Sequence, residues 1–479
     1  MNLQLLIILA YFVLLLVIGW ITKRLSKTST DFLIAGRNLG LVLCTVSILG
    51  EWLGGMSTIG TAEKAYSTGF FPLWYNISTA TGMVLFGFFL AARYRKSNVH
   101  TVGEMLEQLF SRNVRIVTSL CFVIAFVILS YLQLQAVGSV AAQVLGVRYG
   151  PAVLISGLLV TVYVACGGMK SIALTNLIHV LLLYSTLLVV FVITLSAAGG
   201  YSGLFAALSE HLPAEEAAAF MNPFSQGWGQ VVAWLLGGIL AGFASQASIQ
   251  PVFAARDIRT AKRAAFLSAL FIAPIGILIS TLGICVRAGI AGGQPPIAKE
   301  ALPYLMMSAR LMPPWLSGLA MAGIIAAILS TVAPVIFAVS TILTRDIYIL
   351  LRNEQANDRA ILRASRLFVI LIALLAIPLA IFLKGKILDT AYITYAIRGA
   401  AAVAVLAGLY WVKRGQPVSP PQAIITAMIC ATAASLAFVV FKEQLGRLLG
   451  FQIDKVYASI IVSLLAITVV TWFHRLKDS

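Results

Sequence analysis

The residues of this sequence that could do chemistry lie inside long apolar runs. Glu51 and Arg398 are ionisable residues in two such runs, and Ser330 and Thr331 are adjacent hydroxyls in a third. An ionisable group in hydrocarbon is costly and faces a cavity or a partner. Glu51 and Arg398 could therefore pair with each other, or Arg398 could bind a carboxylate bidentately. The two hydroxyls could ligate a hard cation or bond back to a carbonyl one turn earlier.

Catalytic and metal-binding patterns are not evident. An enzyme needs a nucleophile–base pair or a metal cluster, but the four histidines are scattered and the five cysteines show no CxxC spacing. The cysteines stand in apolar runs, as small buried residues do. A channel would need a carbonyl filter or an acidic ring. We therefore expect neither an enzyme nor a channel, and no cofactor.

The composition indicates a membrane protein. Of the 479 residues, 60% are hydrophobic and 11% are charged, against about 45–50% and about 25% in ordinary globular chains. The mean hydropathy is +0.96. The net charge of +17 comes from basic residues in short loops between apolar runs, which membrane topology explains without a nucleic-acid partner.

Thirteen windows are long enough to cross the hydrocarbon core of a bilayer. They are Leu5–Thr22, Leu39–Lys64, Phe70–Ala92, Ile116–Val144, Pro151–Cys166, Ile172–Ala198, Gly229–Val252, Ala264–Val286, Trp315–Leu343, Leu367–Leu383, Ala391–Trp411, Ala423–Val440 and Val456–Phe473. With the N-terminus outside and the C-terminus inside, most of the 34 Lys and Arg residues fall in inner loops. We expect an all-α, polytopic protein of the plasma or inner membrane.

Two windows, Leu39–Lys64 and Gly229–Val252, are unusually rich in glycine and serine. Small residues permit close helix packing, but these windows also open two equal sets of five. Halves with an odd number of spans lie inverted to each other, and a glycine-interrupted helix in each indicates discontinuous helices around a midplane site. The sequence predicts one transmembrane domain over 1–479, with repeats at 39–198 and 229–411 and peripheral helices at 5–22 and 423–473.

Four motifs in order resemble the sodium:solute symporter family. They are Asp31–Gly40, Gly167–Thr175, Gln250 with Ala254–Asp257, and Ala326–Thr331 continuing to Ser340–Tyr348. The resemblance covers nearly the whole chain. It implies the inverted-repeat fold of five plus five helices and secondary active transport of a small solute by alternating access.

The resemblance also implies a sodium site. Ser330 and Thr331 match the family's liganding hydroxyls, the Ala327 carbonyl supports them, and the carbonyls of Thr45 and Ile48 complete the set. Two positions depart from the family. Asn176 stands where an aspartate is common on the ion's exit path, and His179 replaces a glutamine. A histidine can accept a proton, so proton coupling stays open beside sodium coupling.

The expected solute pocket contains Glu51, Trp52 and Arg398. A carboxylate-binding Arg398 favours an amino acid or small organic acid, and Trp52 takes the place of a polar amide common in sugar-carrying relatives. The indole could stack on a ring or an ammonium group. Weaker candidates by position are Ser47, Ser57, Trp234, Ser245 and Gln246.

Several alternatives remain open at this point. Glu51 and Arg398 could form a purely structural ion pair, and the chain could be a sensory membrane protein that acts with a separate signalling partner. The expected partners are a small solute, a sodium ion and the lipid bilayer. A monomer is the expected state.

Overall fold

The computed structural model describes residues 3–24, 26–293, 298–352, 355–383, 387–413, 416–440 and 455–478. Five basic residues that were expected in loops lie outside these ranges: Lys384, Lys386, Arg414, Lys442 and Arg447.

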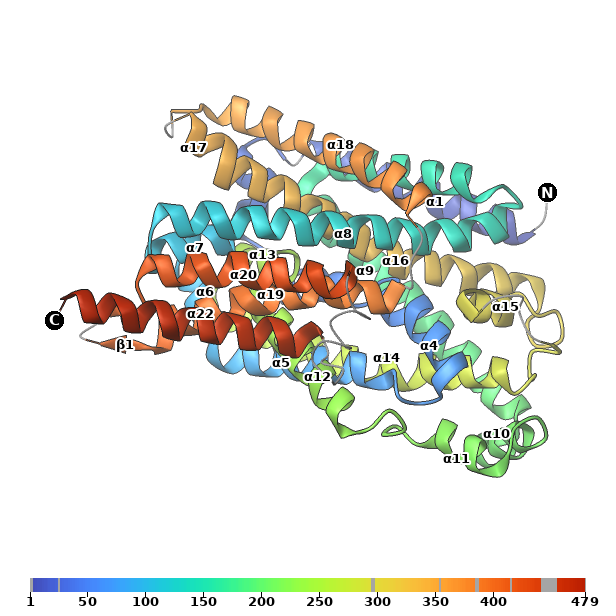
Figure 1. Ribbon diagram of the computed structural model, residues 1–479. Helices are drawn as coiled ribbons and strands as arrows, with labels where there is room; N and C mark the ends of the chain where they lie inside the picture. Colours follow the sequence, from blue (N-terminus) through green and yellow to red (C-terminus); the bar gives the residue numbers. More distant parts are fainter. Residues whose placement is uncertain are drawn as a thin grey trace.

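The described residues are mostly helical, and the long helices run side by side in one elongated bundle (Figure 1). In the first half the elements are α1 (Leu3–Lys23), α2 (Ser29–Ile34), η1 (Ala35–Arg37), α3 (Leu41–Trp52), η2 (Met56–Gly60), α4 (Thr61–Thr68), α5 (Leu73–Phe89), α6 (Ala91–Lys96), α7 (Val102–Leu109), α8 (Arg112–Leu145), α9 (Tyr149–Ala197), α10 (Gly200–Ser209) and α11 (Ala214–Met221).

The second half contains α12 (Trp228–Ala244), α13 (Gln246–Ala254), α14 (Ile258–Arg287), η3 (Ala298–Glu300), α15 (Ala301–Met306), α16 (Pro314–Ile342), η4 (Leu343–Tyr348), α17 (Ile349–Leu351), α18 (Asp358–Phe382), α19 (Ile387–Tyr410), β1 (Val412–Lys413), β2 (Gln416–Pro417), α20 (Pro421–Val440) and α22 (Lys455–Asp478). The two short strands pair antiparallel. The two ends of the chain lie at opposite ends of the bundle (Figure 1).

The number of membrane crossings is smaller than predicted when judged by helix length and apolarity. In the described residues eight helices qualify, or ten when each of two bent pairs is taken as one span, so the count of thirteen is not confirmed. Part of the difference lies in α9, a 49-residue segment that joins two predicted windows. Its backbone leaves helical geometry at Gly168, with φ 57° and ψ −141°. A Cβ there would lie 2.5 Å from the carbonyl oxygen of Phe32, so only glycine fits without rearrangement.

Both helices predicted to be discontinuous are broken. The axes of Leu41–Trp52 and Met56–Thr68 meet at 54°, and those of Trp228–Ala244 and Gln246–Ala254 meet at 41°. At the first break Gly54 and Gly55 lie against other helices. A Cβ at either position would come within 2.5 Å of the Cβ of Thr331 or of Ala136. At the second break Ser245 is extended, with φ −77° and ψ 107°.

Helix α16 forms the centre of the bundle. Its apolar window is wholly buried, and it packs against α9, α8, α1 and α3. A helix that is apolar all round either lies in a protein core or faces lipid, and the complete burial of this window shows that neighbouring helices surround it. The hydroxyl pair Ser330–Thr331 is therefore held well away from lipid.

Candidate functional site at the two helix breaks

The hydroxyls of Ser330 and Thr331 meet the end of α3 at the first helix break. Thr331 Oγ1 donates to the carbonyl oxygen of Gly50 at 2.5 Å and lies 3.2 Å from that of Glu51. Ser330 Oγ donates to the carbonyl of Ala327 at 2.7 Å and lies 3.2 Å from that of Gly50. Five oxygens thus converge from two helices in a buried place. Such a set suits a hard cation.

The carbonyls at this place are not the two that the sequence indicated. The carbonyl of Thr45 accepts a hydrogen bond from Ser268 on α14 at 3.2 Å. Ile48 is fully buried, and no hydrogen bond joins it to the hydroxyl pair among the described residues. The carbonyls of Gly50 and Glu51 face the hydroxyl pair instead. They are free to do so because α3 ends at Trp52, and the last carbonyls of a helix have no partner within it.

Asn176 lies beside the hydroxyl pair. It is fully buried, and neither its amide oxygen nor its amide nitrogen has a hydrogen-bond partner in the described part of the chain. A Cβ added to Gly50 would lie 2.7 Å from Asn176 Cγ and 2.9 Å from the carbonyl oxygen of Ser330. The amide is therefore next to the oxygens just described.

His179, one helical turn beyond Asn176 on α9, is joined to the first helix. Its Nδ1 lies 2.7 Å from the hydroxyl of Tyr11. Its Nε2 is buried and has no partner among the described residues. The histidine thus connects α1 to α9 through Nδ1, and its Nε2 stays available for a further hydrogen bond.

Glu51 and Arg398 form a completely buried ion pair. Arg398 Nη1 lies 2.7 Å from Glu51 Oε1, and the two side chains are 0% and 1% exposed. Ser245, at the second helix break, accepts from Arg398 Nη1 at 2.9 Å and donates to Glu51. Thr394, one turn before Arg398 on α19, accepts from Nε and Nη2, each at 3.2 Å. The pair thus joins both helix breaks to α19.

The pair leaves polar atoms unused inside an aromatic enclosure. Glu51 Oε2 and Trp52 Nε1 are buried and have no hydrogen-bond partner within the described ranges. The Arg398 guanidinium carbon lies 4.5 Å from the ring centre of Tyr395 and 5.7 Å from that of Trp52. Such distances permit cation–π attraction. An acceptor oxygen and an indole donor are thus available beside a paired guanidinium.

The remaining candidates are occupied by other contacts. Trp234 stacks on Tyr392, with ring centres 4.8 Å apart. Ser47 and Ser57 donate to nearby backbone carbonyls of their own segment. Gln246 accepts from the Val102 backbone N–H and donates to the His100 carbonyl, each at 2.9 Å. The structure therefore brings Glu51, Trp52, Ser245 and Arg398 together. The other candidates, which are Trp234, Ser47, Ser57 and Gln246, make their contacts elsewhere.

Sequence reasoning missed three contributors to the site. Thr394 was detectable, because it stands four residues before Arg398 and so shares its helix face. The roles of Gly50 and of Gln133, whose Oε1 accepts from the Gly55 backbone N–H at 2.7 Å, had no signal in the sequence. Both depend on where α3 stops.

Broken helices around a buried cluster of converging oxygens and a buried charged pair are the architecture of a secondary transporter. The chain belongs to the sodium:solute symporter family, whose model matches residues 32–417, and the sequence resemblance is thereby confirmed. It is similar to the osmoregulated proline transporter of Bacillus subtilis, with 23% identity covering 92% of this chain and 89% of the relative.

Two further comparisons agree. A sodium/proline symporter of Staphylococcus saprophyticus is 25% identical over 84% of this chain and 80% of its own length. In fold, the chain is similar to a sodium-coupled sialic acid symporter solved in a substrate-bound, outward-open state. That comparison has a TM-score of 0.82 and 18% identity, and it covers 99% of this chain and 98% of the other. The chain is thus a multi-pass, sodium-coupled solute symporter and not an enzyme.

Proposed function

We propose that this symporter carries an amino acid or a small carboxylate, in preference to a sugar, into the cell by alternating access. The observation that carries the proposal is the Glu51–Arg398 pair at the junction of both helix breaks. Two similar proteins are named for proline, which supports an amino acid. The inverted repeats at 39–198 and 229–411, the plasma or inner membrane and the N-out, C-in orientation belong to the same proposal.

A zwitterion fits the groups at the pair. Its carboxylate would take the Arg398 fork, for which a planar guanidinium is suited. Its ammonium would lie against the unused Oε2 of Glu51, beside the indole of Trp52. The exchange leaves the net charge of the site unchanged, so no bare charge is buried at any stage. A sugar offers no charges for this exchange.

The coupling ion would bind at the hydroxyl pair. The sequence proposes Thr45, Ile48, Ala327, Ser330 and Thr331 as ligands, and the hydrogen bonds favour the carbonyls of Gly50 and Glu51 in place of those of Thr45 and Ile48. All of these ligands are neutral oxygens. A site without a carboxylate ligand holds sodium weakly enough to release it on every cycle.

The test is thermal stability and solute uptake in sodium chloride against choline chloride, over a panel of amino acids and organic acids. A ligand at about 100 times its Kd stabilises the native state by about 2.7 kcal/mol. We expect solute shifts that appear only with sodium. Solute shifts that ignore sodium and follow pH would instead support proton coupling through His179. Stabilisation by sugars alone would contradict the proposed solute class.

A matched pair of variants tests the ion site. Ser330→Ala with Thr331→Ala should abolish sodium-dependent stabilisation. The control is Ser340→Ala with Thr341→Ala, an adjacent Ser–Thr pair on the same helix whose hydroxyls donate to the carbonyls of Ser365 and Phe337. Sodium activation that survives in the first double variant would remove the site assignment.

A further inference from the structure

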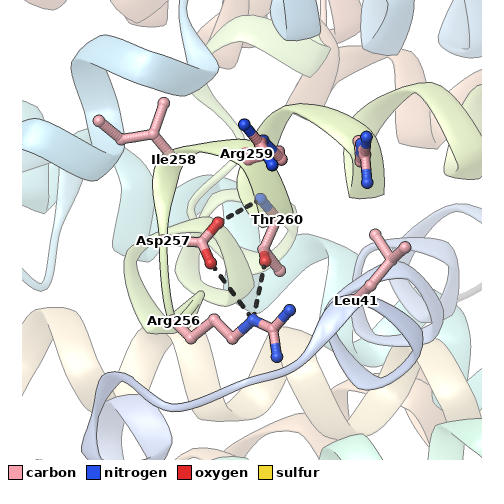
Figure 2. A pocket seen from close by; sticks show the side chains of 7 residues that line it. Leu41, Arg256, Asp257, Ile258, Arg259 and Thr260 are labelled. Atoms are coloured by element: carbon pink, nitrogen blue, oxygen red, sulfur yellow. Dashed lines mark hydrogen bonds and ion pairs between the residues drawn. The ribbon is translucent and has the colours of Figure 1, made fainter.

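A hollow of about 490 Å³ lies where the ends of α3 and α14 meet, near the motif Ala254–Asp257. Its lining combines three basic residues, Arg256, Arg259 and Arg263, with the apolar residues Leu41 and Ile258. Figure 2 shows Leu41 of α3 across the hollow from Arg256, Asp257 and Thr260. None of these groups contributes to the ion or solute site described above.

Most of the cationic groups in this hollow are uncommitted. Asp257, the one acid in the lining, accepts from the Thr260 backbone N–H at 2.7 Å and pairs with Arg256 at 3.3 Å (Figure 2). Within the ranges that the structure describes, the side chains of Arg259 and Arg263 have no hydrogen bond or ion pair. They stand four residues apart on one helix, a spacing at which like charges repel. An anion between them would remove that repulsion.

The basic residues continue into an apolar stripe on the same helix. Leu270 and Ile277 follow Arg263 at intervals of seven residues, which keeps them on one face, and they are 65% and 44% exposed. Beside Leu41, Val42 on α3 is 61% exposed. In a membrane protein such side chains contact acyl chains. A charged end joined to an acyl-facing stripe is complementary to one lipid molecule.

We propose that this hollow binds the phosphate group of an anionic phospholipid, with Arg259 and Arg263 on the phosphate and the acyl chains along Leu270 and Val42. A general excess of basic residues on inner loops orients membrane proteins, but it requires neither a hollow nor an aligned apolar stripe. Basic pockets between transmembrane helices bind anionic headgroups in this way.

The experiment measures lipid binding to the purified full-length chain by native mass spectrometry and by thermal stability. The probes are phosphatidylglycerol, phosphatidylcholine with the same acyl chains, and inorganic phosphate. We expect selective binding and stabilisation by phosphatidylglycerol. Stabilisation by inorganic phosphate equal to that by phosphatidylglycerol would assign the hollow to a free anion and overturn the lipid proposal. Equal binding of the two lipids would also overturn it.

Variants locate the effect. Arg259→Gln with Arg263→Gln should weaken phosphatidylglycerol binding about 30-fold, since each basic residue near an anionic surface contributes about 1 kcal/mol and a factor of ten is about 1.4 kcal/mol. The control is Arg359→Gln with Arg363→Gln, which has the same spacing at the start of α18. Equal weakening in both double variants would contradict a specific site. Arg259→Lys with Arg263→Lys keeps the charge and should retain most of the binding.

Discussion

Removal of one charge from the buried pair is the most informative perturbation of this protein. Arg398 is 0% exposed, and its guanidinium bonds Glu51, Ser245 and Thr394. Arg398→Gln leaves the Glu51 carboxylate buried without its counter-charge. Breaking a buried pair on one side costs about 3–5 kcal/mol, so we expect unfolding free energy to fall by that amount.

Two further variants show whether the loss comes from the uncompensated charge. Glu51→Gln with Arg398→Gln buries no charge, so it should regain more than half of the lost stability. Lys170→Gln removes a partner from the pair Lys170–Asp31, whose side chains are 27% and 26% exposed. That change should cost no more than about 1 kcal/mol.

The assay is unfolding of the detergent-purified protein by heat and by denaturant, followed by solute uptake after reconstitution. If the pair also binds solute, the double Gln variant is folded but shows no solute-dependent stabilisation. A loss below about 1 kcal/mol for Arg398→Gln, equal to that of the Lys170 control, would refute the reasoning. Wild-type uptake by the double Gln variant would leave the pair a purely structural role.

Three other changes have defined outcomes. Gly50→Ala places a Cβ 2.9 Å from the Ser330 carbonyl oxygen and should lower both the unfolding midpoint and sodium affinity; Gly40→Ala, where nothing lies within 4 Å, should do neither. Asn176→Asp adds a negative charge beside the ion site and should raise apparent sodium affinity in the same thermal assay; an unchanged affinity would separate this residue from the ion. Burial alone would raise the pKa of Glu104, but the hydrogen bond from His100 and the charge of Arg345 hold that pKa well below its usual range. The carboxylate therefore stabilises the fold above about pH 4.3 and the stability is lost as pH falls further, so unfolding midpoints below that pH should decline less steeply in Glu104→Gln than in wild type.

The sequence was sufficient to predict the features that arise from local composition. Apolar runs indicated a helical membrane protein, and the glycine- and serine-rich segments indicated the two helix breaks, which the bends of 54° and 41° confirm. The adjacency of Ser330 and Thr331 was visible directly. These signals are carried by neighbouring residues, so they need no knowledge of tertiary contacts.

The register of the first break could not be predicted in the same way. Whether Thr45 or Gly50 presents a free carbonyl depends on the residue at which α3 ends. That end is fixed by contacts from distant segments, including the hydrogen bond of Gln133 to Gly55. Gln246 likewise appeared free for a solute, but its amide is occupied by the backbone of His100 and Val102. Such long-range partners have no signature in a single sequence.

The dual use of Glu51 has a thermodynamic consequence. Its backbone carbonyl faces Thr331, while its carboxylate faces Arg398, so one residue belongs to both proposed binding places. A first ligand that fixes this residue supplies ordering free energy that a second ligand then does not have to supply. Linkage requires the effect to be reciprocal: the factor by which sodium tightens solute binding must equal the factor by which the solute tightens sodium binding. A solute titration with and without sodium, and a sodium titration with and without solute, must therefore give the same ratio of dissociation constants.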